Sequence, residues 1–62
     1  MPFVSIKIAK GRTTDQKRAL VDSVTRAVAA SIEVDPRKVW VQIDEFELDN
    51  FAVDGRLMID TS

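Results

Sequence analysis

The 62-residue sequence contains no cysteine and no histidine. Without cysteine the chain forms no disulfide, and without both residues it lacks the usual ligands of zinc and other soft metals. No metal or other cofactor is therefore expected. No apolar run reaches the roughly 20 residues that a transmembrane helix needs. The first residues also lack the basic and apolar regions of a signal peptide. These absences favour a cytoplasmic protein.

The charges nearly balance, with nine basic and ten acidic residues and a net charge of -1. A nucleic-acid-binding domain usually carries a basic patch, so no nucleic-acid partner is expected. At this length, residues 1–62 are expected to form one domain, which buries only about 60% of the surface that its unfolded chain exposes. Because 45% of the residues are hydrophobic and no disulfide or metal is available, self-association is the expected source of further stability.

Residues 2–9 alternate between two faces, and this pattern predicts a β-strand. One face carries the β-branched residues Val4, Ile6 and Ile8. The other face carries Phe3, Ser5, Lys7 and Ala9. Since Phe3 and Ala9 are apolar, this second face is also expected to be covered.

A helix is predicted to follow, capped by Thr13 and ending near Glu33. Thr13 and Gln16, three residues apart, have the spacing of a capping box. Apolar and small residues then recur at helical spacing, at Leu20, Val21, Val24, Ala27, Val28, Ser31 and Ile32. The polar residues expected on the outer, solvated side are Lys17, Arg18, Asp22, Thr25 and Arg26.

A second strand is predicted over residues 39–46, after a stop and tight turn at Asp35-Pro36. A strand, helix and strand of this length form a βαβ unit with parallel strands. The helix then covers one face of the strand pair, and the face that holds Phe3 and Trp40 has no cover within the chain. Two parallel strands are not stable alone in water. A second copy of the chain is therefore expected to complete the sheet.

The tail, residues 49–62, contains the turn sequence Asp54-Gly55 between short apolar stretches. This arrangement predicts a short hairpin or hooked arm that reaches a neighbouring chain. The expected fold class is α+β: a βαβ unit with parallel strands plus a C-terminal β-hairpin, with the sheet completed by dimerisation.

Pro2 is an unusual first residue for a strand, because proline has no backbone N–H to donate. It is tolerated at a strand's first position. A methionine next to a small residue is commonly removed during synthesis, and the mature chain would then begin with the secondary amine of Pro2. That amine is a candidate base or nucleophile. The alternative is that Pro2 only marks the start of the strand.

The chain resembles the 4-oxalocrotonate tautomerase family over its whole length. The resemblance rests on the spacing MPxxxIxxxxGR, on the Thr, Asp and Gln-Lys that follow it, and on DNFAVDG in the tail. It implies an isomerase that assembles as a homohexamer, a trimer of dimers, with the amino-terminal proline in a pocket between subunits. The implied partner is a small enol or keto acid.

The resemblance also implies roles for three residues. Pro2 would be the general base for keto–enol tautomerisation, or for 1,3-proton transfer in a 2-hydroxydienoate-type acid. Arg12 would grip a substrate carboxylate through two parallel hydrogen bonds, although it also fits a surface arginine at a helix entrance. Phe51 would line the pocket of the proline with help from Phe46 and Val53, although simple interface packing explains it as well.

Trp40 departs from the family pattern, because the best-known members carry a second, carboxylate-binding arginine at this position. An indole N–H donates one hydrogen bond and carries no charge. Trp40 would therefore favour a monocarboxylate such as the enol of phenylpyruvate over a dicarboxylate, or it would only fill the core of the oligomer. Lys38 and Arg56 are candidate replacement cations.

Of two alternatives, the sequence disfavours the first and leaves the second open. The haloacrylate dehalogenases of the same superfamily pair two arginines near the end of strand one with a carboxylate in the arm. Here those places hold Ala9 with Arg12, and Val53, so no group activates water. The other alternative is a non-catalytic or hetero-oligomer subunit that supplies Arg12 to a neighbour. A retained Met1 would favour it, because the Pro2 nitrogen would then be an amide.

Overall fold

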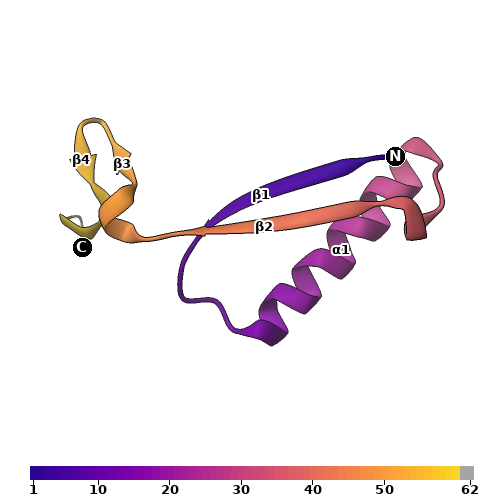
Figure 1. Cartoon of the computed structure of the whole chain (residues 1–62), viewed down its shortest axis with the longest axis horizontal. Helices are drawn as coiled ribbons and strands as arrows, with labels where there is room; N and C mark the ends of the chain where they lie inside the picture. The colour runs from indigo at the N-terminus through magenta and orange to yellow at the C-terminus, as the bar shows by residue number, and fades with distance from the viewer. Residues whose placement is uncertain (61–62) are drawn as a thin grey trace.

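The computed structural model describes residues 1–60 (Figure 1). Its regular elements run in the order β1 (Phe3–Ala9), α1 (Thr14–Ile32), the 3₁₀ turn η1 (Pro36–Lys38), β2 (Trp40–Phe46), the 3₁₀ turn η2 (Leu48–Asn50), β3 (Ala52–Val53), β4 (Arg56–Leu57) and the 3₁₀ turn η3 (Met58–Asp60). The predicted strand–helix–strand–hairpin order is confirmed. Each long strand begins one residue later than the sequence pattern suggested.

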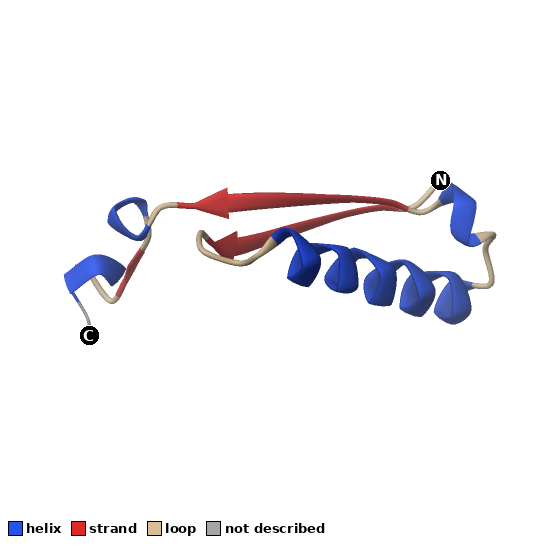
Figure 2. Cartoon of the chain, turned by 90° about the horizontal axis from the view of Figure 1, so that it is seen from below, coloured by secondary structure: helices blue, strands red, loops and turns tan. Residues whose placement is uncertain are grey.

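Strands β1 and β2 lie side by side and parallel, with Phe3 opposite Trp40 and Ala9 opposite Phe46. Helix α1 connects them and runs along one face of the pair, while no element of the described residues covers the other face (Figure 2). The register brings the two sets of β-branched residues onto the same side, where Val4 lies opposite Val41 and Ile6 opposite Ile43. The predicted division into a covered and an uncovered face is confirmed.

Helix α1 begins at the predicted capping box. The Gln16 N–H donates to the Thr13 hydroxyl at 3.1 Å, and the Thr13 N–H donates to the Gln16 side chain at 2.9 Å. The helix ends where Glu33 takes a left-handed φ of 58°. The Val34 N–H then donates to the Ala29 carbonyl at 3.1 Å, which satisfies a terminal carbonyl of the helix. These caps fix the residues at which α1 begins and ends.

No residue among the 60 described is fully buried. The apolar side chains between α1 and the strands, Leu20, Val24 and Val28 among them, are only half-buried. On the uncovered face Phe3 is 58% exposed and Trp40 is 55% exposed. A chain of this size lacks a closed core of its own, as its length indicated.

The tail leaves the end of β2 and forms a separate arm (Figure 1). Its hairpin pairs Ala52 with Leu57 and Val53 with Arg56. Asp54 and Gly55 form the two-residue turn between them, both with positive φ, at 55° and 76°. Positive φ at both positions is typical of the turns that suit hairpin twist. The hairpin is confirmed, whereas η2 and η3 on either side of it were not predicted. The last residues of the predicted arm, 61 and 62, lie outside the described part.

Along residues 1–60, no helix is long and apolar enough to cross a membrane. The same residues contain no group of three or more acidic, histidine or cysteine side chains that would hold a metal ion.

Candidate active site

Pro2 lies at the start of β1 and is half-buried. Its carbonyl accepts a hydrogen bond from the Trp40 N–H at 3.0 Å, which ties it to the beginning of β2. Met1 precedes it and is 82% exposed. The Pro2 nitrogen is an amide while Met1 is attached, so it becomes a free secondary amine only after Met1 is removed. The backbone hydrogen bond from Trp40 would then hold the proline ring at a fixed place where β1 and β2 begin.

Trp40 lies beside Pro2, on the face that α1 leaves uncovered. Its ring is tilted by 57° against the ring of Phe3, with 6.3 Å between the centroids. Such a spacing is within the range of favourable aromatic pairs. The indole is 55% exposed, so it lines a surface and fills no core within this chain.

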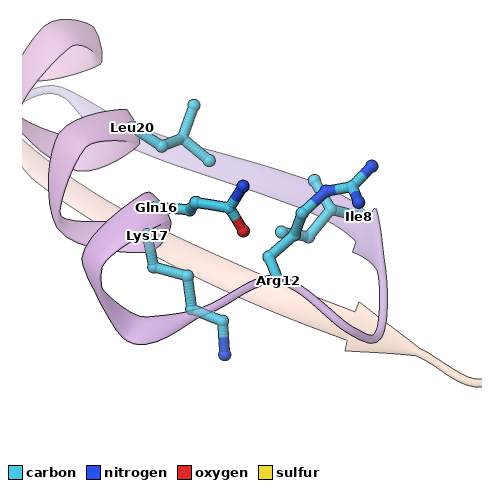
Figure 3. A pocket seen from close by; sticks show the side chains of 5 residues that line it. All are labelled: Ile8, Arg12, Gln16, Lys17 and Leu20. Atoms are coloured by element: carbon cyan, nitrogen blue, oxygen red, sulfur yellow. The ribbon is translucent and has the colours of Figure 1, made fainter.

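Arg12 lies at the opposite end of β1, in the short loop before α1. Gly11 makes this loop possible because its φ of 122° is a conformation that L side chains rarely adopt. The Arg12 side chain lines a pocket of about 250 Å³ together with Ile8, Gln16, Lys17 and Leu20 (Figure 3). An exposed guanidinium above apolar walls is suited to binding an anionic group.

Within residues 1–60, Arg12 is also one of three basic side chains that form no ion pair. Six of the nine basic side chains form ion pairs within residues 1–60, namely Lys7, Lys10, Lys17, Arg18, Arg26 and Arg37. In the same part of the chain no ion pair is formed by Arg12, Lys38 or Arg56. These three are the cations that the sequence suggested for carboxylate binding, and their charge is available to a ligand.

Two lysine–glutamate ion pairs lie on either side of the Arg12 loop. Lys10 contacts Glu47 at 2.9 Å, and this hydrogen bond raises the pKa of the Lys10 ammonium above its usual value. Lys17 contacts Glu45 at 2.7 Å, with both side chains 30% exposed. The expectation that Lys17 belongs to the solvated side of the helix was wrong. Lys17 lies one turn from the start of α1, close enough to reach across to β2.

Phe51 lies beyond the end of β2, at the start of the arm. Its ring centroid is 4.7 Å from that of Phe46, and its carbonyl accepts a hydrogen bond from the Met58 N–H at 2.8 Å. Phe51 is 38% exposed and Val53 is 56% exposed. These side chains present an apolar surface at the arm that lies at the same end of the strand pair as Arg12.

The four candidate residues therefore fall into two groups at opposite ends of the sheet. Pro2 and Trp40 lie where β1 and β2 begin, and Arg12 and Phe51 lie past the points where these strands end. Seven strand residues separate Pro2 from the Arg12 loop, a distance of about 23 Å at the usual rise per residue. One chain does not bring the four side chains together. A pocket containing all of them requires parts of more than one chain.

Comparison with known proteins identifies the family. Residues 2–60 match the Tautomerase family, described as tautomerase enzyme. The 2-hydroxymuconate tautomerase of Bacillus subtilis is 42% identical over 60 residues, 97% of this chain and 97% of that one. The crystal structure of YwhB, a homologue of 4-oxalocrotonate tautomerase, gives a TM-score of 0.95 at 39% identity and covers 98% of this chain and 100% of that one.

A heterohexamer 4-oxalocrotonate tautomerase from Chloroflexus aurantiacus also gives a TM-score of 0.95, at 29% identity and with 100% of both chains covered. The likeness thus holds in sequence and in fold, and it includes the strands, the helix and the hairpin arm. The chain belongs to the tautomerase family, and it is an enzyme of the isomerase class.

Proposed function

We propose that this tautomerase transfers a proton within a small enol or keto acid, with Pro2 as the general base. The observation that carries the proposal is the family match, which begins at Pro2 itself. The 2-hydroxymuconate tautomerase among its relatives supports an enol acid as the substrate class. Removal of Met1 is a condition of the mechanism, since only then does Pro2 have a free amine.

The chemistry follows from the properties of that amine. An α-amino group titrates near ~8 in water, and burial or a nearby cation disfavours its protonated form. The neutral amine then exists at pH 7 and takes a proton from the enol hydroxyl or from a carbon next to the carbonyl. It returns the proton to another carbon of the same substrate. The base is regenerated, and no cofactor takes part in this step.

Arg12 binds the substrate carboxylate in this proposal. A guanidinium forms two parallel, charge-assisted hydrogen bonds with a carboxylate, and the Arg12 guanidinium has no ion-pair partner within residues 1–60. Phe51 provides an apolar wall that keeps the amine dry. Trp40 occupies the position next to Pro2 and favours a monocarboxylate such as the enol of phenylpyruvate over a dicarboxylate.

The active form is an oligomer, which we propose to be a homohexamer built as a trimer of dimers. The support is the uncovered face of the sheet and the separation of Pro2 from Arg12 along β1. In the proposed assembly these two residues come from different subunits. A second candidate function is that of one subunit of a hetero-oligomeric tautomerase, which contributes Arg12 to a neighbour's proline. The heterohexameric relative from Chloroflexus aurantiacus supports it, as does the uncharged Trp40.

The deciding experiment is a tautomerase assay on protein whose intact mass shows that Met1 has been removed. 2-Hydroxymuconate and the enol of phenylpyruvate serve as the dicarboxylate and monocarboxylate probes. Arg12→Ala is expected to lower kcat/KM by roughly ten- to a hundredfold, because a charge-assisted hydrogen bond contributes about 1.5–3 kcal/mol. Arg18→Ala removes another arginine near the start of α1 and is the control. Retention of Met1, or turnover of neither probe, would favour the hetero-oligomer subunit.

A further inference from the structure

Two carboxylates lie near the Arg12 loop, and both are paired with lysines instead of with Arg12. Glu47 is paired with Lys10, just before the loop, and Glu45 is paired with Lys17, just after it. Arg12 itself contacts neither carboxylate. Because a guanidinium forms stronger paired hydrogen bonds with a carboxylate than an ammonium does, this distribution requires an explanation.

Lys17 and Arg12 line the same pocket. Their charged ends point in different directions: the Arg12 guanidinium extends beside Ile8, whereas the Lys17 ammonium extends away from it (Figure 3). Ile8 is the residue of β1 that lies opposite Glu45 in the parallel register. The backbone of Glu45 is thus one strand away from a wall of the Arg12 pocket. Its carboxylate is turned to Lys17, with an N···O distance of 2.7 Å.

The consequence of losing Lys17 follows from these positions. Glu45 would become an unpaired carboxylate on the helix-covered side of the sheet, 30% exposed and only partly screened by water. Lys10 is also close enough to interact with the Glu45 charge, but it is engaged by Glu47. The Arg12 guanidinium, which lines the same pocket as Lys17 and forms no ion pair within residues 1–60, is therefore the expected replacement partner. An Arg12–Glu45 pair would occupy the hydrogen-bonding groups that an incoming carboxylate needs.

We propose that Lys17 is a positioning residue: it holds the Glu45 carboxylate away from Arg12 and so keeps the guanidinium available for the substrate. The inference rests on the proposed role of Arg12 in substrate binding. Lys17 touches no reacting atom in this arrangement. Its effect falls on substrate binding and leaves the proton transfer unchanged.

Three variants of the assembled, Met1-processed enzyme separate this role from a purely structural one. Lys17→Gln frees Glu45 and is expected to raise KM for the enol of phenylpyruvate by about two- to fivefold, the range of a partly exposed ion pair. The kcat is expected to stay unchanged. Glu45→Gln removes the carboxylate that would compete for Arg12 and is not expected to raise KM. The double variant, Lys17→Gln with Glu45→Gln, lacks the ion pair but returns KM to the wild-type value.

The matched control is Arg26→Gln, which breaks the i, i+4 ion pair with Asp22 farther along α1. It is expected to leave KM unchanged. If the double variant shows the same rise in KM as Lys17→Gln, the ion pair is only structural and the proposal is overturned. The same holds if Lys17→Gln leaves KM at the wild-type value.

A crystal structure of Lys17→Gln gives a second readout that does not depend on turnover. The Glu45 carboxylate is expected within hydrogen-bonding distance of the Arg12 guanidinium, and a carboxylate that stays away from Arg12 overturns the proposal. Failure of the proposed function is recognised separately, because Arg12→Ala would then leave KM unchanged. The crystal structure still decides whether Lys17 keeps Glu45 from Arg12 in that case.

Discussion

Phe3 lies directly opposite Trp40 in the parallel strand pair, and the centroids of the two rings are 6.3 Å apart. The rings are 58% and 55% exposed on the face that α1 leaves open. Adjacent exposed aromatic side chains mark an interaction surface. This pair is a surface that a second chain could bury.

Wild-type protein is expected to be oligomeric at micromolar concentration, with the mass of a hexamer in light scattering. Phe3→Asp places a charge in the aromatic pair and is expected to give smaller species, because burying an unpaired carboxylate is costly. Phe3→Leu keeps the surface apolar and is the control. A stable, folded wild-type monomer at this concentration would contradict the expectation.

Pro2→Ala is expected to retain the fold and the oligomer, since Pro2 precedes β1 and has no backbone N–H to donate. The rate is expected to fall by orders of magnitude, because general-base catalysis typically contributes ~10²–10⁴-fold. An alanine amine can still act as a base, but it is held less rigidly and can form an imine with a keto substrate. Steady-state kinetics on Met1-processed protein measures the loss. A near-normal kcat would remove Pro2 from the mechanism.

The dependence of rate on pH offers a separate test of Pro2. In the proposed oligomer, burial and an Arg12 contributed by another chain would both disfavour the protonated amine, so its pKa in the assembled enzyme is expected to lie below that of a free secondary amine. The value of kcat/KM should rise as the pH increases through this pKa and then level off. A flat profile with proton transfer rate-limiting would speak against an amine base.

Trp40→Arg is expected to shift selectivity toward 2-hydroxymuconate and away from the enol of phenylpyruvate. The new guanidinium would lie beside Pro2, where it could bind a second carboxylate. The ratio of the two kcat/KM values is the measurement, and Trp40→Phe, which keeps an aromatic ring without a charge, is the control. If a correctly assembled Trp40→Arg enzyme keeps the wild-type ratio, Trp40 is a packing residue only.

Asp35 provides a pH-dependent contribution to stability. The hydrogen bond from the Arg37 side chain, and then that from the Arg37 backbone N–H, lower the pKa of the Asp35 carboxyl below its usual 3.8. A lowered folded-state pKa gives stability that is present above the unfolded-state value and lost as the pH falls through the folded-state value. Asp35→Asn keeps an oxygen for the cap but loses the charge.

Asp35→Asn is therefore expected to be less stable than wild type at pH 7, with the difference shrinking as the pH falls below 3.8. Urea denaturation at the same protomer concentration and at several pH values measures this trend. A difference that is equal at neutral and strongly acidic pH would mean that the charge of Asp35 does not contribute.

Local patterns were sufficient to predict the elements of the fold. Alternation marked the two strands, and the capping box at Thr13 marked the start of α1. The turn at Asp54-Gly55 marked the hairpin. These signals depend on neighbouring residues and are readable in one chain. The 3₁₀ turns at Leu48–Asn50 and Met58–Asp60 carry no such local signal, and they lie against each other in the arm.

The sequence predicted the arrangement of charges at the candidate site less completely than it predicted the fold. The helical pattern predicted a solvated Lys17 because charged residues are assigned to the outer face of a helix. A lysine side chain is long enough, however, to reach a neighbouring strand. The pair that Lys17 forms with Glu45 joins residues 28 positions apart and leaves no local pattern. The lack of an ion pair at Arg12 within residues 1–60 likewise depends on how the fold places the surrounding charges.

Because β1 separates Pro2 from Arg12, a site built from both residues would be shared between two chains, and this sharing has a genetic consequence. A Pro2→Ala chain still carries Arg12, and an Arg12→Ala chain still carries Pro2. Two such defective alleles expressed together would complement each other, because a mixed assembly contains some sites built from the intact half of each. After a gene duplication, each copy would be free to lose one half of the site. Selection would then preserve the two genes only as a pair.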